Sequence, residues 1–243
     1  MIINCVHGGW HKVKDLLSEI ESYWTTRAEG YSEVNHKELN GMQKGAWLEV
    51  LESQFPKKAK EELKILDIGT GPGFFPVILA EAGYKVTAVD YTQEMLDTAK
   101  RNAGNLCERI SFYKMDAQNL EFEDDVFDVV ISRNLTWNLK DPKRAYEEWC
   151  RVLKPGGHLV ILELTTPDRF PMKQLFSIYS KAVIPLLGKL LSKDNNAYRY
   201  LPDTIKVFPQ GEIMKGVISR AGFSEVNFRR LTFGICTLYT ATK

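Results

Sequence analysis

The stretch Ile65–Asp90, ILDIGTGPGFFPVILAEAGYKVTAVD, decides the fold of this chain. A short apolar run, Lys64–Ile68, stops at a cluster of three glycines, and a helical stretch, Phe75–Ala82, follows the cluster. A second apolar run, Lys85–Val89, ends on Asp90. This pattern predicts a strand, a glycine loop, a helix and a second strand that ends on a carboxylate. Such a βαβ unit binds a nucleoside-bearing cofactor at the carboxyl edge of its strands.

Strands and helices alternate on both sides of this unit. Further strands are predicted at 110–115, 127–132, 158–164, 225–231 and 234–242, and helices at about 92–103, 141–153 and 210–221. The last two strands are joined by a tight turn and should form an antiparallel pair at the sheet edge. The rhythm predicts an α/β fold, a Rossmann-like, doubly wound, seven-stranded sheet that is mostly parallel with an antiparallel C-terminal strand.

The N-terminal segment should be helical. Apolar residues three and four apart predict a helix over Trp10–Trp24, followed by a polar and aromatic stretch that Gly30 breaks. A second helix is predicted over about Lys37–Leu51.

The rhythm of strands and helices is lost between Thr165 and Phe208. Residues 171–191 are apolar and helical in pattern, interrupted at Pro185 and Gly188, and predict a helical cap. We therefore expect one domain over 1–243. Its parts are N-terminal helices (1–62), a cofactor-binding core (63–164), a cap insertion (165–209) and a C-terminal helix with a strand pair (210–243).

The composition excludes several classes of protein. With 32 Lys and Arg against 31 Asp and Glu, the net charge of +1 gives no sign of the basic surface that nucleic acids require. The four cysteines are far apart and the four histidines are scattered, so we expect reduced thiols and no metal site in a cytoplasmic protein. A signal-peptide pattern and a run of about 20 apolar residues are both lacking.

The glycine loop, DIGTGPGF, departs from the nicotinamide fingerprint. Phe74 stands where that fingerprint has its third glycine, and Asp67 lies two residues before the first one. S-adenosylmethionine (SAM) carries a sulfonium and an ammonium group and no pyrophosphate, so a carboxylate beside bare backbone suits it. The structural alternative is a glycine turn before an ordinary helix.

Several residues are expected to bind SAM. Asp90 should accept hydrogen bonds from the two ribose hydroxyls. Asp116 and Ala117 are expected at the adenine edge and Met95 at the adenine face, although a solvated loop carboxylate and simple packing are the alternatives. The other expected cofactor-binding residues are Gly69, Thr70, Gly71, Gly73, Tyr91 and Arg133.

The motifs as a set resemble a known family. LDIGTGPGFF, VTAVD, MDAQNLEFEDDVFDVVIS and RVLKPGGHLVILE, over about residues 40–165, are similar to the class I SAM-dependent methyltransferases. The segments YRYLPDTIKVFP and LTFGICTLYT, with Arg133-Asn134 after the fourth strand, resemble the UbiE/MenG family, which C-methylates quinone precursors. The chain departs from that family at Tyr31–Asn35, where the family's Tyr-Asp-x-Met-Asn segment is YSEVN.

The resemblance implies a SAM-dependent methyltransferase of menaquinone biosynthesis. It would methylate a carbon of a demethylmenaquinone-like ring and release S-adenosylhomocysteine. A carbon acceptor must first lose a hydroxyl proton, and a cation beside the developing phenolate lowers that cost. Arg133 is the expected cation, Asn134 would orient a hydroxyl or a water, and Tyr31 would gate the site or relay a proton. The alternatives are an ion pair for Arg133 and packing for Tyr31. No residue stands out as a general base, which leaves a water relay open.

Residues 171–191 contain three lysines and no acidic residue. They suit peripheral contact with the inner face of a membrane that holds a prenylated quinol. A lid on the chain's own domain and the interface of a homodimer are equally consistent with this pattern. For function, the alternatives are O-, N- or C-methylation of another small molecule, a non-catalytic SAM-binding protein, and a nicotinamide oxidoreductase.

Overall fold

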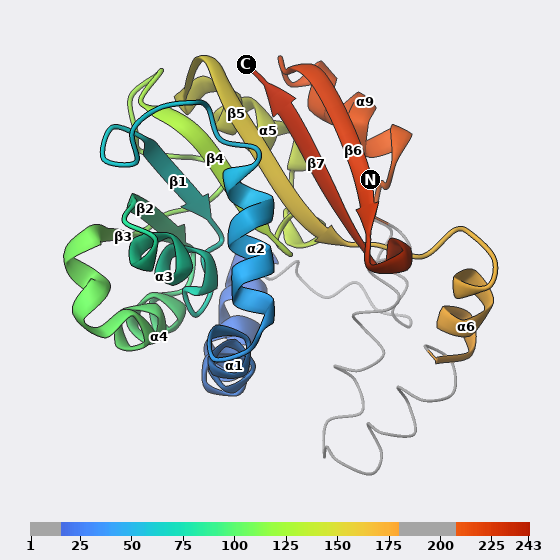
Figure 1. The fold of residues 1–243 in the computed structure, drawn as a ribbon, viewed down its shortest axis with the longest axis horizontal. Helices are drawn as coiled ribbons and strands as arrows, with labels where there is room; N and C mark the ends of the chain where they lie inside the picture. Colours follow the sequence, from blue (N-terminus) through green and yellow to red (C-terminus); the bar gives the residue numbers. More distant parts are fainter. Residues whose placement is uncertain (1–15, 180–207) are drawn as a thin grey trace.

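A computed structural model describes residues 16–179 and 208–243, and within these ranges seven strands form one sheet (Figure 1). The strands are β1 (Lys64–Ile68), β2 (Lys85–Asp90), β3 (Ile110–Lys114), β4 (Phe127–Arg133), β5 (Leu153–Leu164), β6 (Ser224–Leu231) and β7 (Cys236–Thr242). Their order is β3-β2-β1-β4-β5-β7-β6. β7 runs antiparallel to β5 and β6, whereas all the other pairs are parallel. The predicted fold class is confirmed.

Helices cover both faces of the sheet (Figure 1). α2 (Gln43–Glu52) and α3 (Phe74–Glu81) pack on one face, and α5 (Pro142–Val152) and α9 (Glu212–Arg220) pack on the other. α4 (Gln93–Ala103) packs on β2 and β3, and α6 (Met172–Ile178) follows β5. Short 3-10 turns lie at Gly104–Arg109, Thr136–Asn138 and Thr232–Gly234.

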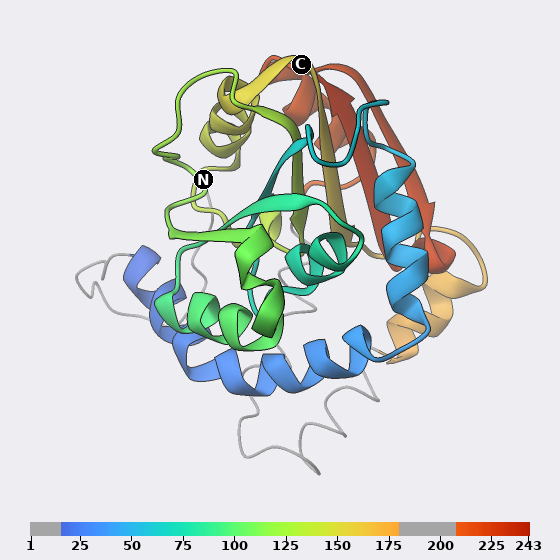
Figure 2. The same cartoon turned by 60° about the vertical axis from the view of Figure 1, so that its left-hand side comes forward.

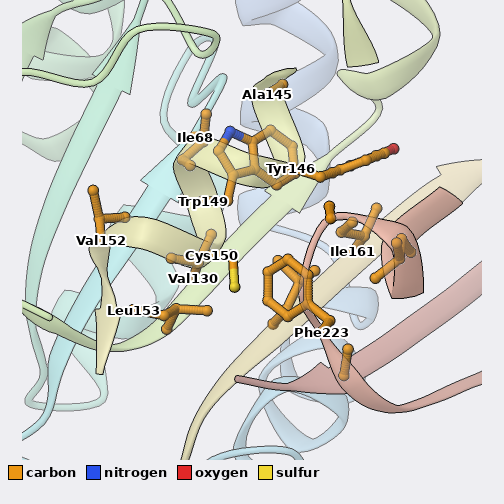
Figure 3. Packing of buried hydrophobic residues seen from close by; sticks show 14 of the residues in the cluster. Ile68, Val130, Ala145, Tyr146, Trp149, Cys150, Val152, Leu153, Ile161 and Phe223 are labelled. Atoms are coloured by element: carbon orange, nitrogen blue, oxygen red, sulfur yellow. The ribbon is translucent and has the colours of Figure 1, made fainter. Parts of the chain in front are cut away.

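The alternation of side chains along each strand explains the two layers of core. In β4, Val129 and Ile131 pack toward α3 while Val130 packs toward α5, and all three are fully buried. Figure 3 shows Trp149 and Tyr146 of α5 lying over the second of these layers. Each such buried side chain contributes roughly 1.5–3 kcal/mol of transfer free energy.

The N-terminal helices differ from the prediction. α1 (Leu16–Leu39) runs through Gly30 without a break, and the chain turns later, between α1 and the start of α2 at Gln43. Glycine in a helix costs only about 1 kcal/mol relative to alanine, and the packing of α1 on α4, with Ala28 buried, offsets that cost. Figure 2 shows α1 crossing one end of the molecule beside α4. The first residues of the predicted helix, from Trp10, lie outside the described residues.

The described part of the cap is small. α6 falls inside the segment predicted to be apolar and helical, but most of 171–191, including Pro185 and Gly188, lies outside the described residues. The division of the chain into four parts stays a prediction. Across the described ranges, we find no helix with the length and apolarity needed to cross a membrane.

Candidate functional site

The loop after β1 is built on three glycines with positive φ. The φ angles of Gly69, Gly71 and Gly73 are 72°, 52° and 91°. A Cβ on Gly71 would meet nothing within 4 Å, whereas a Cβ on Gly73 would lie 2.9 Å from the Cβ of Ala99 in α4. Gly71 therefore leaves open space for a ligand, and Gly73 allows close packing of α3 on α4. Gly73, a predicted cofactor-binding residue, lines neither of the two pockets that lie beside this loop.

The end of β2 is tied to this loop through Asp90. The Gly71 amide donates to one oxygen of the Asp90 carboxylate at 2.8 Å, and the Thr92 amide donates to the other at 2.9 Å. Burial raises the pKa of this carboxyl against the opposing effect of its backbone donors. The Thr92 hydroxyl and the Tyr91 amide are also hydrogen-bonded to this carboxylate, so ligand hydroxyls would share its lone pairs with protein donors.

A first pocket extends from Asp90 along the ends of β2, β3 and β4. Eight predicted cofactor-binding residues line it. They are Gly69, Gly71, Asp90, Tyr91, Met95, Asp116, Ala117 and Arg133. The backbone amide and side-chain amide of Gln118 donate to Asp116 Oδ1 at 2.9 and 3.0 Å, which fixes the carboxylate. These residues lie where an adenosine would extend from the glycine loop.

A second pocket adjoins the first and contains Asp67 and Thr70. The two pockets share Tyr31, Gly69, Gly71, Arg133 and Asn134, so they form the two ends of one site.

Asp67 is the buried acid of this second pocket. It is 2% exposed, and burial raises the pKa of its carboxyl to about 7, with Asp90 adding repulsion and Thr70 and Arg133 opposing the shift. A buried carboxylate at a pocket wall fits the cationic end of SAM.

Arg133, at the end of β4, makes a two-pronged ion pair with Glu38 of α1. The two guanidinium nitrogens lie 3.0 and 2.7 Å from the two carboxylate oxygens. The guanidinium also stacks 4.7 Å from the centre of the Phe74 ring. Among the described residues that line either pocket, Arg133 is the only cation. The ion pair that was the alternative role for Arg133 is therefore present, and it lies in the wall of the site.

Asn134 and Tyr31 meet beside Arg133. Asn134 adopts a left-handed φ of 55°, which asparagine tolerates. Its backbone amide donates to the Leu162 carbonyl at 2.9 Å. The Tyr31 hydroxyl is hydrogen-bonded to the Asn134 side chain, and burial raises the pKa of that hydroxyl while Arg133 opposes the rise. The three expected catalytic residues are therefore brought together, whatever their roles.

Glu163 of β5 supports this corner from behind and was not among the predicted residues. It is fully buried, and one carboxylate oxygen accepts hydrogen bonds from the amides of Leu135 and Thr136 at 2.9 and 2.6 Å. The same oxygen accepts from the Thr136 hydroxyl at 2.8 Å. Burial raises the pKa of this carboxyl to about 7. A carboxylate at the end of a buried strand was the available sequence signal.

The α1 face of the site was also missed. α1 contributes Ile20, Trp24, Val34, Asn35 and Glu38 to the two pockets. The spacing of apolar residues predicts a helix but not which turn of it lies over the sheet edge, so no local signal marked these residues.

The sheet order, the glycine loop and the buried carboxylate define a SAM-dependent methyltransferase of the Rossmann-like class. Solved structures share the fold. For a SAM-dependent methyltransferase from Aquifex aeolicus the TM-score is 0.60 at 20% identity, covering 90% of this chain and 97% of that one. For a Haemonchus contortus phosphoethanolamine N-methyltransferase 2 in complex with SAM the TM-score is 0.66 at 18% identity, covering 95% and 60%.

The chain belongs to the ubiE/COQ5 methyltransferase family, whose model matches residues 28–243. It is 47% identical over 229 residues to a demethylmenaquinone methyltransferase of Bacteroides fragilis, which covers 93% of this chain and 92% of the relative. It is 36% identical over 186 residues to a demethylmenaquinone methyltransferase of Thermus thermophilus, covering 76% and 84%. The predicted family, the methyltransferase activity and SAM as the cofactor are confirmed, and a nicotinamide oxidoreductase is set aside.

Proposed function

We propose that this enzyme methylates a ring carbon of a demethylmenaquinol-like aromatic acceptor. The observation that carries the proposal is the meeting of Arg133, Asn134 and Tyr31 where the two pockets join. Relatives named demethylmenaquinone methyltransferase, at 47% identity over nearly the whole chain, support the same acceptor.

The chemistry needs alignment and a stabilised phenolate. Bound SAM supplies an electrophilic methyl group on its sulfonium sulfur. Alignment of the acceptor with that group can lower the barrier by ~7–11 kcal/mol. A phenol has a pKa near 10 in water, so a guanidinium beside the ring oxygen favours the ionised, electron-rich ring. We assign this role to Arg133, the orientation of the ring hydroxyl to Asn134, and the gating of the acceptor to Tyr31.

The cofactor is assigned to the remaining residues. Asp67 would face the ammonium group of SAM, Asp90 the ribose hydroxyls, and Asp116 with Ala117 the adenine edge. Gly69, Thr70 and Gly71 would follow the methionine part, and Tyr91 and Met95 the adenine faces. The support for this assignment is the division of the residues between the two joined pockets. Asp67 and Thr70 line the second pocket, Gly69 and Gly71 line both, and the other residues line the first.

We place the acceptor at a membrane surface because apolar side chains in α6 and just before it are exposed. Leu175 and Ile178 of α6 are 54% and 62% exposed, and Phe170 before the helix is 82% exposed. Lys173 adds a positive charge between them. Contact with the inner face of the cytoplasmic membrane would give a prenylated quinol access, whereas a dimer would bury the same side chains.

An acceptor panel tests the proposal. Purified enzyme with methyl-labelled SAM is offered demethylmenaquinol in vesicles, a soluble hydroxynaphthalene, a catechol and small amines. We expect label on the ring carbon of the quinol and stoichiometric S-adenosylhomocysteine. Methylation of a soluble acceptor with the quinol untouched would overturn the quinol assignment and leave the methyltransferase class intact. The quinone profile of cells that lack the gene gives a second readout, in which demethylmenaquinone should accumulate.

A further inference from the structure

The catalytic set described above lacks a base. Carbon methylation of a hydroquinone removes one proton from a ring hydroxyl, yet Arg133 stays protonated and the amide of Asn134 does not accept a proton. Burial raises the pKa of the Tyr31 hydroxyl, so Tyr31 keeps its own proton at neutral pH.

Among the described residues that line the two pockets, the carboxylates remain as candidates for the general base. Asp67, Asp90 and Asp116 line the part that the cofactor would occupy. Asp90 is already engaged by the amides of Gly71 and Thr92. Glu38 lines the second pocket together with Asp67, but it differs from the three aspartates because its carboxylate is paired with the guanidinium of Arg133.

The position of Glu38 is fixed by the fold. It lies in the last turn of α1, and the two-pronged pair with Arg133 holds its carboxylate at the end of β4. Its side chain is 23% exposed, so the carboxylate is neither buried in the core nor free in solvent. The charged and titratable groups around it are Arg133 from β4, Tyr31 from its own helix and Asp67 from β1.

We propose that Glu38 is the general base that takes the proton of the acceptor hydroxyl, directly or through one water. The proposal rests on the proposed function, because it needs a hydroxylated ring as the acceptor. A carboxylate in water is too weak a base to ionise a phenol fully. Here the transfer of the proton also changes the anion with which Arg133 pairs. As Glu38 becomes neutral, the guanidinium loses a carboxylate partner and gains the phenolate, so the positive charge stays compensated throughout.

The reaction balances as a cycle at Glu38. The ring O–H bond breaks, its proton passes to a Glu38 oxygen, and the phenolate remains beside Arg133. The ring carbon then forms its bond to the methyl group, while the electron pair of the broken C–S bond stays on sulfur as a neutral thioether. The same ring carbon releases its hydrogen to solvent as a proton, and the ring oxygen takes back the proton from Glu38. One proton is released in each turnover, and Glu38 is again ionised.

Glu38→Gln is the first test, since the amide keeps the shape of the side chain and one hydrogen-bond acceptor for Arg133. We expect kcat to fall by about 100-fold or more at pH 7, while the SAM dissociation constant stays within about twofold by calorimetry. The residual rate should rise about tenfold per pH unit, because the acceptor must then ionise in solvent. Glu33→Gln is the matched control, since Glu33 is an exposed acid on the same helix that lines neither pocket.

Chemical rescue separates a base from a support for Arg133. In Glu38→Ala, added formate or acetate should restore turnover in a saturable way, whereas chloride at the same ionic strength should not. Wild-type kcat in Glu38→Gln, or a lost rate that neither pH nor formate restores, would overturn the proposal. Wild-type enzyme that methylates no hydroxylated ring would instead overturn the proposed function. An unchanged unfolding midpoint for each variant shows that the fold is intact.

Discussion

The Gly71 amide and the Asp90 carboxylate are joined by a hydrogen bond of 2.8 Å that links the loop after β1 to the end of β2. The two residues are 19 positions apart in the chain, but both line the first pocket, where we propose that the cofactor binds. The bond fixes the Asp90 carboxylate in the lining of the pocket and anchors the backbone of the loop at Gly71. We therefore expect removal of the carboxylate to affect cofactor binding both directly and through the loop.

Asp90→Ala should weaken SAM binding by at least tenfold, which is about 1.4 kcal/mol. The substitution removes the acceptor for the Gly71 and Thr92 amides as well as the proposed ribose contact. Asp90→Asn, which keeps one carbonyl oxygen, should have an intermediate effect. Isothermal titration calorimetry measures both, and equal affinity in all three proteins would remove Asp90 from the ribose role.

Two glycines of the loop should respond differently to the same added methyl group. Gly73→Ala forces a Cβ to within 2.9 Å of the Ala99 Cβ at a φ of 91°, and it should lower the free energy of unfolding by about 1–3 kcal/mol. Gly71→Ala meets no neighbour, so it should cost about 1–2 kcal/mol of backbone strain but narrow the pocket and weaken SAM binding. Urea unfolding and calorimetry on both variants distinguish the effects. Weaker SAM binding in Gly73→Ala alone would contradict this division.

Arg133→Ala should lower turnover by about 100-fold and SAM affinity much less. The guanidinium lies against Glu38 and Phe74 at the joint of the two pockets, where the acceptor is proposed to bind. Arg133→Lys keeps the charge but loses the two-pronged geometry, so we expect it to recover only part of the rate. Steady-state kinetics with a quinol acceptor check this, and a normal rate in Arg133→Ala would make the residue structural.

The sheet and the cofactor loop could be predicted from the sequence because both depend on local patterns. Apolar runs such as Phe127–Ser132 predict strands buried on both faces, and the structure has β4 there. The glycines and Asp67 predict the loop because backbone freedom and charge are properties of single residues. These features need no knowledge of distant contacts.

The face that α1 adds to the site depends on tertiary packing. Whether Glu38 meets Arg133 is set by how α1 crosses the sheet edge, over a separation of 95 residues. Gly30 illustrates the same limit, since its local cost predicted a break that packing against α4 overrides. The pairing of Arg133 was foreseen as an alternative, but its partner was not.

Binding of SAM should depend on pH through Asp67. The pKa of its carboxyl is raised to about 7 in the free protein, and a cationic ligand favours the ionised form. Below pH 7 the carboxyl must release a proton before it can pair with the ligand, so affinity should fall by up to tenfold per pH unit from pH 7 to 5.5. Asp67→Asn should bind more weakly with a flatter pH dependence. A wild-type affinity that does not change over this range would show that Asp67 does not face the cationic end.

Glu163 should make the stability of the protein depend on pH in the direction opposite to a paired surface carboxylate. Its pKa is raised from 4.5 to about 7 by burial, so the folded state holds a proton over a pH range in which the unfolded state has lost it. The free energy of unfolding should therefore fall as pH rises from about 4.5 to 7 and level off above that. Glu163→Gln keeps an oxygen for Leu135 and Thr136 and cannot ionise. We expect the variant to match the wild type near pH 4.5 and to exceed it by up to a few kcal/mol at pH 8. Urea unfolding at the two pH values measures the difference, and a variant that is equally destabilised at both would show that Glu163 is ionised in the folded protein.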